Sequence, residues 1–251
     1  MVLLLVVDLD PGLSALRPLG GFFVLRTAGE QRAPLPTLAQ VYTDTVPDVF
    51  DDPLTFRVRK VAESLRVSER RIAASIAHQG LAARLWSVAL GCAVLHGRTP
   101  DLAPRLLCWD ADASAPDDLW LTAVRPLPGD AATVADVVLE GHLRPLAAAL
   151  RARYRLAEGL LWGNAGSALA GAARELDRWA GAHGRPDAAA RAHALTTELL
   201  AHPLLVGTGV RAGTAFRRRS CCLYYRVPEG GVCGDCCFTR APRSSPRGAS
   251  G

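Results

Sequence analysis

The chain has 251 residues, of which 49% are hydrophobic and 21% charged, a composition typical of a folded globular protein with a substantial core. Its net charge is +5 at pH 7, and the surplus lies within residues 205–251, which contain eight arginines and only two acidic residues. A globally basic surface would favour nucleic acid as the partner, whereas a surplus confined to one short segment argues against it and indicates a local task for positive charge.

Two apolar stretches do not fit export or membrane segments. Residues 1–7 lack a basic region in front and a small-residue cleavage site, so we predict no secretory signal. Residues 81–96 are interrupted by Arg84, Ser87 and His96 and are shorter than the ~20 residues of a membrane helix. We therefore expect a cytoplasmic protein without stable membrane insertion.

The first half of the chain predicts short strands around helices. Residues 22–25 follow two glycines and predict a strand, and residues 34–47 predict a loop with at most one short helix. Apolar spacing predicts a helix from Thr55 to Val67 and another stretch from Ser68 to about His96. Breaks at Gly80 and Gly91 would divide this second stretch into two helices. Residues 105–109 and 118–124 predict a pair of strands joined by an exposed turn.

The second half is predominantly helical. The clearest helix runs from Thr133 to about Tyr154. Another begins near Asn164 or Ser167 as N-cap, so that Trp162 and Asn164 fall between two helices, where they either line a pocket or pack and cap. A third covers residues 186–201, with proline in its first turn.

The Gly- and Thr-rich residues 207–214 predict a linker. Their glycine spacing is one residue too long for a dinucleotide loop and lacks the strand–helix context. The predicted fold class is therefore mainly α with a few short β-strands (α+β). It comprises a helical body over residues 1–206 with short N-terminal and central strands, a small C-terminal cysteine-rich segment over residues 207–241, and a disordered tail over 242–251.

Five of the seven cysteines lie within residues 221–237, with the spacing C-C-x10-C-x2-C followed by one further cysteine. In a reducing cytoplasm such clustering indicates metal binding rather than disulfides. A structural zinc site is the common alternative, but zinc ribbons use two C-x2-C clips and this segment has one. Adjacent cysteines point to opposite sides of an extended chain and must be turned toward one centre, which is easier with two irons than with one zinc.

The remaining cysteines and the histidines give weaker signals. Cys92 and Cys108 each stand alone in an apolar stretch, where a cysteine behaves as a small buried hydrophobe. The six histidines show no metal-ligand spacing, and we expect packing or surface roles for them.

The spacing C-C-x10-C-x2-C, preceded by basic residues and following a mainly helical chain, resembles that of the ferric-siderophore reductases of the FhuF type. The resemblance is strongest over residues 216–236, and the segment Leu160-Leu-Trp-Gly-Asn164 is similar to one in actinobacterial members. It implies that a 2Fe–2S cluster is held by Cys221, Cys222, Cys233 and Cys236. Cys237 is an addition to the pattern, so an exchange of Cys236 for Cys237 as ligand stays open.

The resemblance further implies a reductase that passes one electron to a ferric siderophore, of the hydroxamate type, and receives electrons from a ferredoxin or a flavoprotein. A 2Fe–2S cluster on four thiolates carries a charge of −2 when oxidised and −3 when reduced, so nearby cations favour the reduced form. Candidates for cluster tuning or partner docking are Arg217, Arg218, Arg219 and Arg226. The alternatives are a structural zinc protein and a helical protein of siderophore biosynthesis, which would need a nucleotide pocket that no phosphate-binding motif supports.

Overall fold

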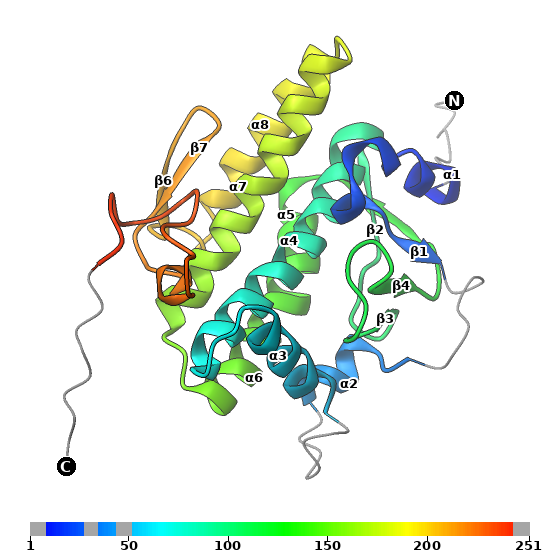
Figure 1. Cartoon of the computed structure of the whole chain (residues 1–251). Coiled ribbons are helices and arrows are strands. Elements are labelled where there is room, and N and C mark those ends of the chain that lie inside the picture. The colour runs from blue at the N-terminus through cyan, green and yellow to red at the C-terminus, as the bar shows by residue number, and fades with distance from the viewer. Residues whose placement is uncertain (1–8, 28–34, 44–51, 243–251) are drawn as a thin grey trace, which may run out of the picture.

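The computed structural model describes residues 9–27, 35–43 and 52–242. The predictions for residues 1–7 and for the tail beyond Pro242 lie outside these ranges. Two long helices, α4 (Arg70–His96) and α7 (Glu158–Ala182), lie side by side at the centre of the molecule (Figure 1). Shorter helices pack around them: α1 (Leu9–Ser14), α2 (Leu38–Thr43), α3 (Pro53–Ser64), α5 (Ala131–Ala135), α6 (Arg144–Tyr154) and α8 (Pro186–Leu200).

Helix α4 is buried on almost all sides, as expected for a helix whose apolar residues are not confined to one face. The predicted division at Gly80 and Gly91 is wrong, because the helix is unbroken and ends only at Gly97 in a left-handed conformation (φ 67°). Gly91 instead admits Phe23: a Cβ at this position would lie 2.9 Å from the Phe23 Cδ1 atom. The glycine therefore serves close packing rather than a break.

The predicted helix from Thr133 to Tyr154 is present, but its middle is a π-helix, η4 (Asp136–Leu143), between α5 and α6. His142 lies in this wide turn and is fully buried. Its Nδ1 atom lies 2.9 Å from the Tyr42 hydroxyl and its Nε2 atom 2.5 Å from the Leu102 carbonyl oxygen. The ring thus joins α2 and the chain before β3 to this helix.

Helix α7 begins at Glu158, so the predicted start at Asn164 or Ser167 is wrong. Trp162 and Asn164 lie inside the helix and not between two helices. Asn164 is completely buried, and its side chain bonds to residues of α4 and of the C-terminal segment instead of capping a helix. The structure agrees with the predicted helices from Thr55 and from Pro186, which appear as α3 and α8, and with one short helix, α2, in the loop before them.

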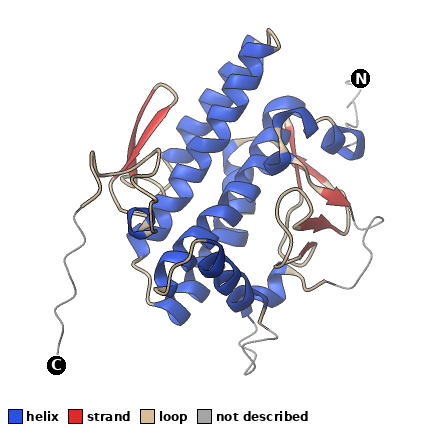
Figure 2. Cartoon of the chain, in the orientation of Figure 1, coloured by secondary structure: helices blue, strands red, loops and turns tan. Residues whose placement is uncertain are grey.

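The strands are short and lie on two opposite sides of the helical body (Figure 2). The predicted central pair is present as β3 (Leu107–Trp109) and β4 (Leu119–Leu121), which are antiparallel, and β1 (Arg26–Thr27) adds to β4 in parallel. Two hairpin-like pairs were not predicted: β2 (Arg98–Pro100) with β5 (Pro126–Pro128), and β6 (Gly209–Ala212) with β7 (Ala215–Arg218).

Two predictions for the chain outside the helices are therefore wrong. Residues 22–25 do not form a strand, because a 3-10 turn η2 (Gly21–Phe23), which follows η1 (Arg17–Leu19), directs Phe23 into the core. Residues 207–214 are not a linker, because β6 pairs with β7. Gly209 permits this pairing, since a Cβ there would lie 2.2 Å from the Phe216 Cζ atom.

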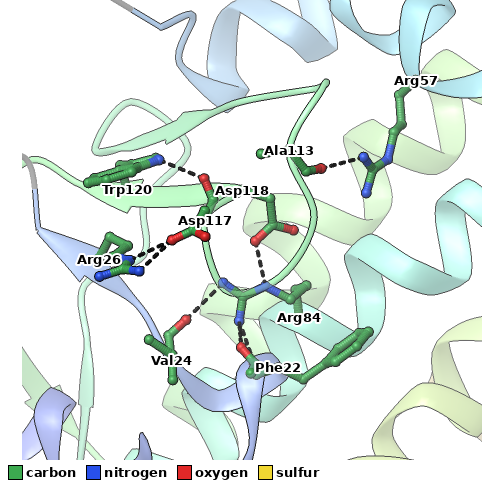
Figure 3. A network of polar contacts seen from close by, with 10 residues as sticks. Phe22, Val24, Arg26, Arg57, Arg84, Ala113, Asp117, Asp118 and Trp120 are labelled. Carbon is green, nitrogen blue, oxygen red and sulfur yellow. Dashed lines mark hydrogen bonds and ion pairs between the residues drawn. The ribbon is translucent and has the colours of Figure 1, made fainter. Parts of the chain in front are cut away.

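A buried ion pair fixes the N-terminal segment to α4 and β4 (Figure 3). The Arg84 Nε atom lies 2.8 Å from an Asp118 carboxylate oxygen, and both side chains are at most 4% exposed. The remaining guanidinium donors bind the carbonyl oxygens of Gly21, Phe22 and Val24. Arg84 thus sets the position of the turn that carries Phe22. No described helix combines the length and the apolar character that a membrane crossing requires.

Candidate metal centre

The cysteines of the C-terminal segment lie together after β7. The Cys222 and Cys233 sulfur atoms are 3.4 Å apart, so the two cysteine pairs fold back on each other as the glycine and proline residues between them predict. Cys222 is buried, and Cys221, Cys233, Cys236 and Cys237 are partly exposed. Within the described ranges, no group of three or more His, Cys, Asp or Glu side chains is arranged so that it could hold a metal ion.

Local turns orient the cysteine side chains. Leu223 adopts a left-handed conformation (φ 70°) directly after the cysteine pair, and its amide donates to the Cys221 sulfur at 3.3 Å. The Phe238 amide donates to the Cys236 sulfur at 3.4 Å. Such a turn is what adjacent cysteines need to present both sulfurs on one side. Amide hydrogen bonds to sulfur are also among the interactions that set the reduction potential of an iron–sulfur cluster.

The thiols differ in their tendency to ionise. The hydrogen bond from the Cys233 thiol lowers the pKa of Cys222 to about 6, with a further contribution from the positive charge of Arg218, although burial opposes it. The same hydrogen bond and burial raise the pKa of Cys233. Burial raises the pKa of Cys221 to about 11. Since metals bind the thiolate, the lowered pKa of Cys222 favours it as a ligand.

A chain of buried hydrogen bonds connects this segment to the two central helices. Arg218, on β7 and 2% exposed, donates through Nη1 to the Asn164 side-chain oxygen. The Asn164 amide nitrogen donates to the Ser75 carbonyl oxygen at 2.9 Å and to its hydroxyl at 3.0 Å. The Ser75 hydroxyl donates to the Cys222 carbonyl oxygen at 2.8 Å. Residues of α7 and α4 therefore hold the backbone at the cysteine pair.

The guanidinium of Arg218 is only partly hydrogen-bonded. Among the described residues, its Nε and Nη2 atoms have no hydrogen-bond partner and no carboxylate pairs with it; the two ring nitrogens of buried His78 also lack partners. Burial, together with the Arg218 charge, lowers the pKa of His78 to about 3. A buried, unpaired guanidinium is costly unless an anion compensates it. A 2Fe–2S cluster on four thiolates would supply that negative charge, so the residues present fit such a cluster.

Asp235 fixes the second cysteine pair. Its carboxylate accepts hydrogen bonds from the Ser167 hydroxyl and from Arg174, whose Nη1 atom lies 3.0 Å away. Its backbone oxygen accepts from the Arg218 amide at 3.0 Å. The Cys233-Gly-Asp-Cys236 loop is thereby tied both to α7 and to β7.

Comparison with known families agrees with this geometry. Residues 78–207 match the family described as "Ferric iron reductase FhuF-like transporter", and residues 218–238 match the "FhuF 2Fe-2S C-terminal domain". The chain belongs to the FhuF family. It carries the 2Fe–2S domain of these ferric iron reductases and is therefore an iron–sulfur protein rather than the structural zinc protein considered as an alternative. No curated protein sequence matches the chain.

Within this FhuF-type chain, the four predicted arginines have different surroundings. Arg218 is buried, so its side chain is not available for contact with a partner. The other three are exposed: Arg217 donates to the Cys237 carbonyl oxygen, and Arg226 pairs with Glu69 at 2.9 Å. Cys92 and Cys108 are buried in α4 and β3 as predicted, and burial raises the pKa of both thiols.

Sequence reasoning missed Ser75 and Asp235, which hold the cysteine segment, and did not predict that His78 is buried within reach of the Arg218 charge. The signal nearest to them is the Trp162-Gly-Asn164 segment, which the FhuF resemblance drew attention to. Its glycine makes room for the cysteine segment, since a Cβ at Gly163 would lie 2.1 Å from the Ser220 hydroxyl oxygen. In the sequence, this contact is indicated by an asparagine that directly follows a glycine on a buried helix face.

Proposed function

We propose that the protein reduces ferric siderophores of the hydroxamate type by one electron in the cytoplasm, with a 2Fe–2S cluster held by Cys221, Cys222, Cys233 and Cys236. The observation that carries the proposal is the convergence of the two cysteine pairs beside the buried, unpaired guanidinium of Arg218. The family supports iron–sulfur-dependent ferric reduction. Beyond this family activity, we propose the siderophore substrate, its hydroxamate type, the cytoplasmic compartment and the four cysteine ligands.

In this function the bound cluster supplies single electrons. The residues of the chain need to hold it, set its potential and control access to it, and no acid, base or nucleophile is required. Arg218, buried and next to the thiols, favours the more negative, reduced state. The Leu223 and Phe238 amides donate to sulfur and act in the same direction.

The ferric siderophore is the electron acceptor. One electron converts its Fe(III) to Fe(II), which hard hydroxamate oxygens hold much less tightly, so the metal can leave the chelator. The electron comes from a separate ferredoxin or flavoprotein. Exposed Arg217, Arg219 and Arg226 form a basic surface next to the cysteines that suits an acidic donor, and such docking should weaken as ionic strength rises.

A reoxidation experiment tests the reaction. Protein purified without oxygen and reduced with dithionite should be bleached, and a stoichiometric ferric trihydroxamate should restore the visible absorption while a ferrous-specific chelator reports one Fe(II) per cluster. A reduced protein that keeps its bleached spectrum in the presence of ferric hydroxamates would refute the proposed function.

Serine variants test the ligands. Cys221→Ser and Cys233→Ser should abolish the visible absorption and the bound iron, whereas Cys92→Ser and Cys108→Ser, which change buried thiols outside the cysteine segment, should leave both unchanged. Comparison of Cys236→Ser with Cys237→Ser decides the remaining ambiguity. Loss of colour in Cys237→Ser alone would replace Cys236 in the ligand set.

A further inference from the structure

A cleft lies between the two central helices next to the cysteine segment. It encloses about 330 Å³, at the lower end of the range of about 300–1,000 Å³ that is usual for small-molecule sites. Its walls are one face of α4, one face of α7, the turn at residues 19–23 and the side chain of Asp235. It is therefore formed by four parts of the chain that are far apart in the sequence.

The residues on the two facing helices explain why this space is open. On α4 the lining residues Gln79, Ala83 and Ser87 are spaced four apart, so they share one face. On α7 the facing positions are small, and a Cβ at Gly171 would meet only the Arg174 guanidinium at 3.8 Å. The space at this point thus arises because the residues facing it have small side chains, and not because the two helices are far apart.

Polar groups with free hydrogen-bonding capacity line the cleft. Ser87 is 3% exposed, and neither its hydroxyl nor the Gln79 amide bonds to another residue within the described part of the chain. Phe22 adds an apolar surface at the mouth, with 46% of the residue exposed, and Arg84 holds the turn that carries it (Figure 3). An occupant with both polar oxygens and apolar connecting chains would use both kinds of contact.

The charges of the lining select among such occupants. Among the described residues, Arg174 is the one cation that lines the cleft, and it is paired with Asp235. Glu175 adds a second carboxylate, whose partner Arg178, 2.7 Å away, lies outside the lining, so the lining residues themselves carry a formal charge of −1. This charge accepts a neutral or cationic complex and opposes a polyanionic one.

The position of Asp235 links the cleft to the metal centre. Asp235 lies between Cys233 and Cys236 in the sequence, so its Cα atom is about 3.8 Å from that of Cys236. A molecule in the cleft that touches Asp235 therefore contacts the Cys233-Gly-Asp-Cys236 loop directly, at the residue next to Cys236. Electron transfer falls steeply with distance, and an electron acceptor held in this cleft would lie against the loop that carries Cys233 and Cys236.

We propose that this cleft binds the ferric chelate, with Phe22, Gln79 and Ser87 as contacts, and that it prefers neutral or cationic complexes over polyanionic ones. This assignment rests on the proposed function for the identity of its occupant. The binding itself does not require electron transfer and is measured without it.

The test uses a chelate that cannot be reduced. The gallium(III) complex of a linear trihydroxamate is titrated into cluster-loaded protein in a calorimeter. Gly171→Leu places a side chain in the cleft and should weaken binding at least tenfold, and because leucine is a better helix former than glycine, α7 should not suffer. Gly181→Leu is the matched control: it makes the same change on the same helix at an exposed position where a Cβ meets nothing within 4 Å.

Each outcome decides the assignment. Equal affinities of wild type, Gly171→Leu and Gly181→Leu would overturn it, as would failure of the wild type to bind the gallium complex. If the Gly171→Leu protein loses its visible spectrum, Ala83→Leu fills the same space from α4 and takes its place. A gallium tricatecholate, with a charge of −3, should bind more weakly than the trihydroxamate, and equal or tighter binding would overturn the charge preference.

These measurements distinguish a failure of the cleft assignment from a failure of the proposed reductase function. If the gallium trihydroxamate binds to wild type and not to Gly171→Leu, the cleft is supported even when ferric hydroxamates do not reoxidise the reduced protein. If reoxidation proceeds equally in wild type and in Gly171→Leu, the reductase function stands and the cleft assignment falls.

Discussion

Substitution of Arg84 by methionine removes the guanidinium that joins α4 to the N-terminal turn and to β4, while it keeps an unbranched side chain of similar length. The change leaves the Asp118 carboxylate, whose side chain is 4% exposed, without its cation. It also leaves the carbonyl oxygens of Phe22 and Val24 without their donors. Because both partners of the ion pair are buried, solvent screening does not reduce the loss.

Breaking a buried ion pair by removing one partner costs about 3–5 kcal/mol. A typical protein has a total stability of about 5–15 kcal/mol, so the loss is a large part of it. For a chain of this size, about 2–4 °C of melting temperature corresponds to each kcal/mol. Arg84→Met should therefore lower the midpoint of thermal unfolding, followed by circular dichroism at a fixed heating rate, by roughly 6–20 °C.

An exposed ion pair provides the control. Arg144 pairs with Glu140 one turn away on the surface, with side chains 55% and 40% exposed, and solvent screening leaves such exposed pairs little effect on stability. Arg144→Met should thus shift the midpoint by no more than about 2 °C. The double variant Arg84→Met/Asp118→Leu should recover part of the loss, because it removes the unpaired carboxylate. If Arg84→Met lowers the unfolding midpoint no more than Arg144→Met does, the buried network does not contribute this stability.

Three further predictions concern other parts of the chain. Because burial lowers the pKa of His142 to about 4, this residue binds a proton in the unfolded but not in the folded chain between about pH 4 and 6.5. His142 alone should therefore contribute a fall in stability of about 1.4 kcal/mol per pH unit of acidification in this window, in addition to the contribution of buried His78, and His142→Gln should remove its share of the slope in urea titrations. Arg218→Met should lower the reduction potential of the cluster in a redox titration, and the exposed Arg219→Met should change it much less; equal shifts would contradict the role of burial. Gly129→Ala should destabilise the protein, because its Cβ would lie 2.6 Å from the Gly97 carbonyl carbon, whereas Gly80→Ala in an open helical position should add up to about 1 kcal/mol in the same unfolding measurement.

Elements with a strong local signal were predictable from the sequence. The helix from Pro186 has proline at its start, where the missing amide costs nothing, and α3 and the β3–β4 pair follow from apolar spacing between turn residues. The convergence of the two cysteine pairs also follows from local features, since Gly230 and Pro228 lie between them. In each of these cases the residues that decide the structure are close together in the sequence.

The sequence-based predictions are wrong where residues far apart in the sequence determine the local structure. Asn164 has the properties of a helix cap, and it lies inside α7 because Ser75 and Arg218, 89 and 54 residues away, satisfy its amide. Phe23 has the β-propensity of a strand residue, but the space left by Gly91 draws it into the core through a 3-10 turn. The burial of Arg218 could not be predicted either, because three consecutive arginines look alike in the sequence and only the pairing of β6 with β7 decides which one faces inward.

The fit of the cysteine segment against α7 has a consequence for protein engineering. A two-stranded hairpin is at best marginally stable on its own, and the apolar residues of this segment, such as Phe216, are buried against the small residues of α7. A peptide of residues 207–241 therefore lacks most of the surface that shapes it, and grafting its four cysteines onto another scaffold would transfer the spacing without the fold. A minimal version of the centre has to include the helix faces that carry Ser75, Asn164 and Ser167.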